Sequence, residues 1–116
     1  MYDHIGLHVK NLDASVRFYT AALAPLGHVP ADGAGFGPPG NPGLWLYRDA
    51  NAQGPGTHVA FRATSRAAVD AFHAAGLANG GRDNGGAGVR ADYAPNYYAA
   101  FLVDPDGNNV EAVCME

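Results

Sequence analysis

The chain has 116 residues, 47% of them hydrophobic, and carries a formal net charge of −4 at pH 7. This length and apolar content suit one domain with its own core and argue against disorder. The sequence has only seven Lys and Arg compared with eleven Asp and Glu, which excludes a basic nucleic-acid surface. No apolar run approaches the roughly 18 residues of a membrane span, and residues 1–10 do not resemble a signal peptide. With one cysteine and no internal disulfide, we expect a soluble, cytoplasmic protein.

The first predicted element is a strand over residues 3–10, "DHIGLHVK", in which polarity alternates. Period-two alternation with β-branched residues is typical of a half-buried strand. One parity holds Ile5, Leu7 and Val9, and the other holds His4, Gly6 and His8. Four residues of strand span roughly 13 Å, so His4 and His8 share a face but do not bind the same ion.

The sequence contains an internal repeat. Residues 3–23, "DHIGLHVKNLDASVRFYTAAL", align with residues 57–77, "THVAFRATSRAAVDAFHAAGL", and His4 matches His58 at an offset of 54. After the strand the offset is 53, which matches Tyr19 with Phe72. Each copy is a strand followed by an amphipathic helix. Coincidence between two alanine-rich helices is the alternative explanation.

Both helices have boundary signals. In the first copy one apolar stripe follows the helical period, and its members are Leu12, Val16, Tyr19, Leu23 and Leu26. Asn11 and Ser65 are the predicted N-caps. Pro25 and Gly27 end the first helix.

Shorter strands follow each helix. In the first half they are predicted at 27–29, 34–37 and 43–49, and in the second half at 96–104 and 108–115. "DPDG" at 104–107 predicts a hairpin turn with Gly107 in the left-handed region. The stretch 79–88, "NGGRDNGGAG", is predicted to be a loop, and it does not match a phosphate-binding glycine motif. The fold class is therefore α+β, with helices outside and a curved sheet whose other face forms a cup.

These motifs resemble the vicinal oxygen chelate superfamily of glyoxalases, bleomycin resistance proteins and extradiol dioxygenases. The resemblance is carried by "DHIGLHV…FY" at 3–19, "GTHVAF" at 56–61 and "DPDGNNVEAV" at 104–113. It implies a single glyoxalase-like domain over residues 1–116, built from modules at about 1–52 and 56–116. The two βαβββ modules would form an eight-stranded sheet or open barrel.

The resemblance also implies a divalent metal inside the cup. Carried over residue by residue, the ligands are His4, His58 and Glu111, and the fourth family position falls at Trp45. Glyoxalase I has a glutamate there, so its proton shuttle between two carboxylates is disfavoured. The parity of the last strand independently turns Glu111 into the cup, where a carboxylate needs a partner or a metal. The competing interpretation is an ion pair of Glu111 with Arg62 or Arg90.

Further residues are predicted to line the pocket. His8 and Arg62 lie four residues beyond His4 and His58, and each is placed either against a polar substrate group or at a solvated strand end. Hairpin register sets Phe101 opposite Glu111 and puts Tyr97 on the same face. Tyr97 is a candidate for substrate hydrogen bonding or acid/base work, against simple packing. Three other residues are assigned structural places: Cys114 in the helix-facing core, and His28 and His73 at the surface.

Two function classes stay open. The first is a metal-dependent lyase or dioxygenase that acts on a small oxygen-rich substrate, or a thiol transferase, with Fe, Mn, Zn or Ni as the ion. Glu111 and Tyr97 are its candidate catalytic residues, and Trp45 and Phe101 contribute the apolar wall. The second is a metal-free binding protein of the bleomycin-resistance type. Family habit predicts a homodimer, with modules paired within one chain or exchanged between chains.

Overall fold

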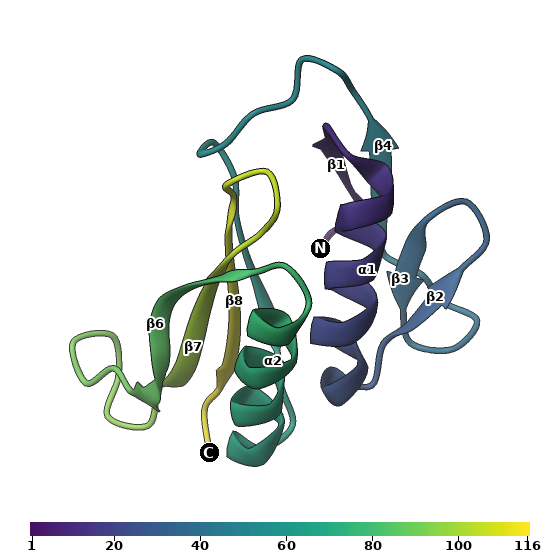
Figure 1. The fold of residues 1–116 in the computed structure, drawn as a ribbon. Helices are drawn as coiled ribbons and strands as arrows, with labels where there is room; N and C mark the ends of the chain where they lie inside the picture. The colour runs from purple at the N-terminus through teal and green to yellow at the C-terminus, as the bar shows by residue number, and fades with distance from the viewer.

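The repeat is visible in the fold as two four-stranded sheets. A computed structural model describes residues 1–116, and Figure 1 shows one helix beside each sheet and the two helices side by side. The elements of the first half are β1 (Ile5–Val9), α1 (Leu12–Leu23), a 3₁₀ turn (Ala24–Leu26), β2 (Val29–Ala31), β3 (Gly35–Gly37) and β4 (Leu44–Arg48). Those of the second half are β5 (His58–Arg62), α2 (Arg66–Ala78), β6 (Arg82–Val89), β7 (Tyr98–Val103) and β8 (Asn109–Cys114).

The strand orders of the two sheets are equivalent. The first sheet has the order β1-β4-β3-β2 and the second has β5-β8-β7-β6. In each sheet the first and last strands of the half run parallel, and the remaining pairs are antiparallel. The predicted α+β class is confirmed, with the eight strands divided between two sheets.

The helices begin where their caps predict. The Asn11 side chain accepts a hydrogen bond from the Ala14 amide, and the Ser65 hydroxyl accepts one from the Ala68 amide. Each cap satisfies one of the amide groups left free at a helix start. Gly27 follows the 3₁₀ turn with φ +86°, a left-handed conformation that glycine adopts without strain.

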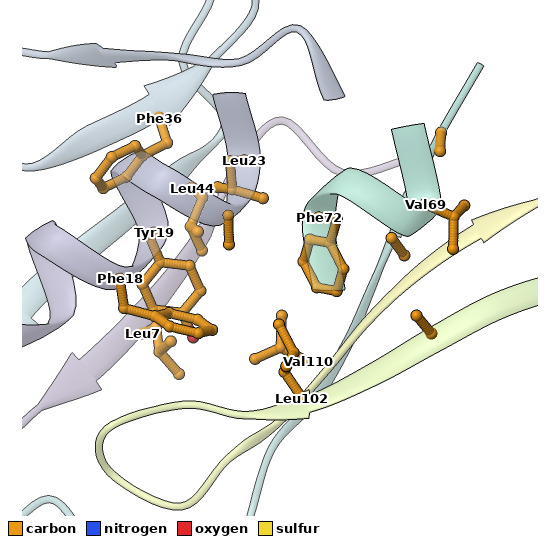
Figure 2. Packing of buried hydrophobic residues seen from close by; sticks show 14 of the residues in the cluster. Leu7, Phe18, Tyr19, Leu23, Phe36, Leu44, Val69, Phe72, Leu102 and Val110 are labelled. Carbon is orange, nitrogen blue, oxygen red and sulfur yellow. The ribbon is translucent and has the colours of Figure 1, made fainter. Parts of the chain in front are cut away.

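The core lies between the helices and one face of each sheet. Figure 2 shows Phe72 pointing from α2 toward Val110 and Leu102, while Tyr19 and Phe18 gather with Leu7 on the side of α1. Cys114 is buried in the same core, as predicted. Because the helices cover this face of each sheet, the opposite faces lack a helical cover. We call these the first and second open faces.

Polar contacts join the halves around the turn at 104–107. Asp104 is 2% exposed and accepts a hydrogen bond from the Tyr19 hydroxyl of α1 at 2.6 Å. The Lys10 amide donates to Asp106 at 2.8 Å. Gly107 has φ +93°, so the predicted left-handed turn position is confirmed. The carboxylates of this turn therefore hold the first half against the second.

Two sequence predictions were wrong. Residues 82–89 of the predicted glycine-rich loop form strand β6, which pairs with β7 through an irregular register. Pairing with a long neighbouring strand overrides the low strand propensity of glycine. His28 and His73 are not surface residues: His28 is half-buried beside Phe61, and the His73 side chain is 15% exposed and bonded to Asp83. Neither helix is long and apolar enough to cross a membrane.

Candidate functional site

A buried carboxylate occupies the middle of the second open face. Strand β8 lies between β5 and β7, and the register sets Glu111 beside Ala60 on one side and Phe101 on the other. Glu111 is only 2% exposed. Its Oε1 lies 2.8 Å from Nε2 of His58, whose side chain is 51% exposed. The pair therefore joins a buried acid to an imidazole that solvent reaches.

Tyr97 holds the other carboxylate oxygen. Its hydroxyl donates a hydrogen bond to Oε2 of Glu111. Burial, then the hydrogen bond to Glu111 and its charge, raise the pKa of Tyr97 to about 12. The phenol is therefore protonated at neutral pH and acts as a donor. With His58 and Tyr97 in place, both oxygens of the buried carboxylate have partners, as burial of such a group requires.

Aromatic and cationic side chains form the wall beside this cluster. The rings of Phe101 and His58 have centroids 6.3 Å apart, and the guanidinium of Arg90 lies 5.3 Å from the Phe101 centroid. Neither Arg90 nor Arg62 makes an ion pair with Glu111. The competing sequence interpretation, a Glu111–arginine pair, is therefore wrong for this chain.

A hollow lies at the end of β5, and Ala60, the strand neighbour of Glu111, is one of its lining residues. It has a volume of about 530 Å³. Ala60 and Val113 contribute small apolar surfaces, and Arg62 stands among the lining residues without a hydrogen-bond partner. The predicted pocket residue Arg62 is thus on the same strand as His58, with an unpaired charge.

The first open face carries different chemistry. The register sets Trp45 beside Gly6, as Glu111 stands beside Ala60 in the second sheet. His4 is exposed, and its Nδ1 lies 2.7 Å from Asp3. This face therefore offers an imidazole and an indole in the places where the second sheet has an imidazole and a carboxylate.

His8, the other predicted pocket residue, forms a separate pair with Asp49. Its Nδ1 lies 3.1 Å from the Asp49 carboxylate. The Asn51 amide, and after it His8, hold the pKa of Asp49 below its ordinary value. His8 also lines a polar hollow of about 270 Å³ with Thr57 and Asn108. Sequence reasoning missed this pair because the two residues are far apart in the chain and no motif joins them.

Two of the three predicted metal ligands come together. His58 and Glu111 are in contact, whereas no group of three His, Cys, Asp or Glu side chains able to hold a metal ion forms within one chain. The spacing of the pair still suits a metal. Neighbouring ligands about 2.1 Å from an octahedral ion lie about 3 Å apart, close to the 2.8 Å between Nε2 and Oε1.

Comparison with known proteins gives one family. The family model of the Glyoxalase/Bleomycin resistance protein/Dioxygenase superfamily matches residues 2–112. None of the curated proteins matches the chain significantly.

Solved structures give the same result. A glyoxalase/bleomycin resistance protein from Albidiferax ferrireducens T118 is 33% identical, with 100% of this chain and 99% of that chain covered and a TM-score of 0.82. A glyoxalase/bleomycin resistance protein/dioxygenase family enzyme from Burkholderia phytofirmans PsJN has 14% identity, 98% coverage of both chains and a TM-score of 0.75. A glyoxalase/dioxygenase from Nostoc punctiforme has 20% identity, coverage of 100% and 91%, and a TM-score of 0.72. The last two likenesses concern the fold alone.

Proposed function

The chain belongs to the glyoxalase/bleomycin resistance protein/dioxygenase superfamily, and from that premise we propose that it is a divalent-metal-dependent enzyme acting on a small oxygen-rich substrate. The observation that carries the proposal is the cluster of His58, Glu111 and Tyr97 on the second open face. A carboxylate that is 2% exposed and held by an accessible imidazole and a phenol is a candidate functional group, because buried titratable groups with specific partners are concentrated at functional sites.

The donor set fits the ion. One imidazole and one carboxylate suit Fe, Mn, Zn or Ni, and a metal in this place would polarise substrate oxygens and stabilise negative charge. Tyr97 fixes the second oxygen of Glu111, so that the first oxygen is oriented toward His58. Residues that hydrogen-bond to metal ligands orient those ligands in this way.

His4 is the third donor, supplied by a second copy of the chain. Within one chain His4 bonds to Asp3, apart from His58 and Glu111. Both open faces lack a helical cover, so a twofold dimer can set the first open face of one copy against the second open face of the other. Each dimer would then hold two equivalent sites. His8 and Trp45 would complete the substrate pocket from the first face, opposite Phe101 and Arg62.

The test is the metal content of anaerobically purified protein, before and after loading with Fe, Mn, Ni or Zn. We expect one ion per chain in the wild type and at least about a hundredfold weaker binding in Glu111→Gln, His58→Ala and His4→Ala, because each removes a ligand. His73→Ala is the matched control, since His73 also bonds a carboxylate, Asp83, but away from the site. Full metal binding by Glu111→Gln would refute the proposal.

The identity of the ion then narrows the reaction. Iron would favour oxygen chemistry, and nickel, zinc or manganese would favour a lyase, isomerase or transferase. A wild type that binds none of these ions would instead favour the metal-free binding function of a bleomycin-resistance protein.

Mixing inactive variants tests the shared site. A dimer of one His4→Ala chain and one Glu111→Gln chain contains one intact site only if His4 comes from the other copy. We expect such mixtures to regain metal binding that neither variant has alone. A mixture that stays metal-free, with mixed dimers verified by native mass spectrometry, would place His4 with the donors of its own chain.

A further inference from the structure

A fixed cation stands beside the candidate site. The guanidinium of Arg90 donates hydrogen bonds to the carbonyl oxygens of Gly86 at 2.7 Å and Gly88 at 2.9 Å, while it lies over the Phe101 ring. Phe101 is directly opposite Glu111 in the β7–β8 ladder, and its ring neighbours that of His58. Arg90 is therefore held at the wall of the site by three separate contacts.

The glycines of β6 make room for this arrangement. A Cβ at Gly85 would lie 3.1 Å from Nη2 of Arg90 and 3.2 Å from the Phe101 ring, and one at Gly88 would lie 3.3 Å from Nη1. Gly85 also has φ +143°, and the β6–β7 register shifts on either side of it. The irregular, glycine-rich strand thus lets the arginine fold back onto the sheet face.

The charge of Arg90 is left unbalanced. No carboxylate lies within ion-pair distance of it, although the chain has a net charge of −4. The two glycine carbonyls engage two of the five N–H groups that a guanidinium offers. The remaining donors match the paired oxygens of a carboxylate. Arg62 likewise makes no ion pair, and it lines the hollow together with the exposed Glu116.

We propose that Arg90 binds the carboxylate of the substrate, so that the enzyme takes small carboxylate-bearing molecules whose apolar part packs on Phe101. This assignment names the substrate class of the site and rests on the proposed function. It makes Arg90 a specificity-determining residue, whereas His58 and Glu111 serve the metal.

The test compares benzoate with its neutral isostere benzamide in NMR titrations of the metal-free protein at constant pH and ionic strength. We expect benzoate to shift the amide signals around Arg90 and Phe101, and to bind at least about tenfold more tightly than benzamide. Arg90→Gln should weaken benzoate about tenfold and leave benzamide unchanged. Arg66→Gln is the matched control, because Arg66 also lies over an aromatic ring, that of Tyr98, but on the helix side of the same sheet. It should change neither affinity by more than about twofold.

The Arg90→Lys variant distinguishes the effect of the Arg90 charge from a disturbance of strand β6. Lysine keeps the charge but not the planar fork, so we expect an intermediate loss of benzoate binding even if Arg90→Gln disturbs β6. Equal affinity for benzoate and benzamide, or benzoate binding that both Arg90 variants retain in full, would overturn the assignment. Metal loading of the same samples separates the two proposals. If the wild type binds metal but binds benzoate no more tightly than benzamide, only this inference fails. If it binds benzoate through Arg90 but binds no metal, only the proposed function fails.

Discussion

The two open faces have the same strand order but carry different side chains at equivalent positions. Trp45 and Glu111 occupy equivalent register positions beside Gly6 and Ala60. On the first face the Trp45 ring fills the space above Gly35, where a Cβ would come within 2.5 Å of it. On the second face the equivalent position holds a buried acid with two hydrogen-bond partners.

The repeat therefore gives the two halves the same strand order, helix caps and core positions, while the polar side chains of the candidate site differ between the halves. Strand order, helix caps and core positions agree between the halves. Trp45 and Glu111 on the open faces depart from the repeat, and so does Tyr19, which bonds to Asp104 of the other half. A second carboxylate on the first face would place two acids near one site, whereas an indole gives a shaped wall. Under the proposed function, the second half supplies His58 and Glu111, and the first half supplies His4 together with the indole of Trp45.

The largest expected effect tests whether the two halves have equivalent cores. Tyr19 of α1 and Phe72 of α2 are equivalent in the repeat and are 1% and 0% exposed. We expect Phe72→Ala and Tyr19→Ala each to lower the free energy of unfolding by about 3–5 kcal/mol, because a large buried ring leaves a cavity. Urea denaturation measures this loss. Leu77→Ala, at an exposed position of α2, should cost well under half as much. A small loss of stability at only one of the two rings would show that the cores of the two halves are not equivalent.

The next effect concerns the one polar difference between these rings. The Tyr19 hydroxyl donates to buried Asp104, and Phe72 has no such group. Tyr19→Phe should lower stability by about 1.5–3 kcal/mol, the usual size for a hydrogen bond to a charged group. The reverse change, Phe72→Tyr, should also destabilise by about 1–3 kcal/mol, because it buries a hydroxyl in a packed apolar site. Tolerance of Phe72→Tyr without loss would show that the second core has room or a partner for the hydroxyl.

The same hydrogen bond gives a pH dependence. Burial, and then the charge and hydrogen bond of Asp104, raise the pKa of Tyr19 well above 10.0. The folded protein thus holds this proton more tightly than the unfolded chain does, so the stabilisation is complete below pH 10 and is lost as pH rises toward the folded-state pKa. Wild-type stability should therefore fall more steeply above pH 10 than that of Tyr19→Phe. Parallel curves would contradict this assignment.

Local and repeating signals were enough to predict much of the fold. The caps Asn11 and Ser65, the helical stripes and the Gly107 turn depend on neighbouring residues, and each was confirmed. Strand β6 could not be predicted in the same way, because its glycines form a strand only through pairing with β7. The short strands of the first half were placed within a few residues of their observed bounds.

For the candidate site, the alternation of residues along the strands predicted which side chains share a face, but not which of them make contact. Alternation along β8 turned Glu111 away from the helices, and hairpin register set Phe101 opposite it. The partners of these residues depend on side-chain reach across the sheet, which parity does not specify. The bond from Tyr97 to Glu111 and the stacking of Arg90 on Phe101 therefore appear only in three dimensions.

A carboxylate introduced on the first open face would test the difference between the two faces directly. Under the proposed function, Trp45→Glu adds a ligand beside His4, so we expect metal affinity to rise about tenfold, or roughly 1.4 kcal/mol, at unchanged stoichiometry. Trp45→Gln is the control, since it removes the indole without adding charge. Isothermal titration with Mn or Ni measures both. A second ion per chain would mean that each sheet binds its own metal, contrary to the shared site.

The smallest expected effect is at Gly6, the equivalent of Ala60 in the second sheet. A Cβ at Gly6 would lie 2.7 Å from Cε2 of Tyr47, but Tyr47 is 48% exposed, so its ring can turn aside. We expect Gly6→Ala to change the free energy of unfolding by no more than about 0.5 kcal/mol, the range of tolerated surface substitutions. Gly37→Ala is the contrasting variant, because its Cβ would meet the backbone at Asn41, 2.5 Å away, which cannot move as freely. A large loss at Gly6 would show that the position of the Tyr47 ring is fixed, and that the first open face is as closely specified as the second.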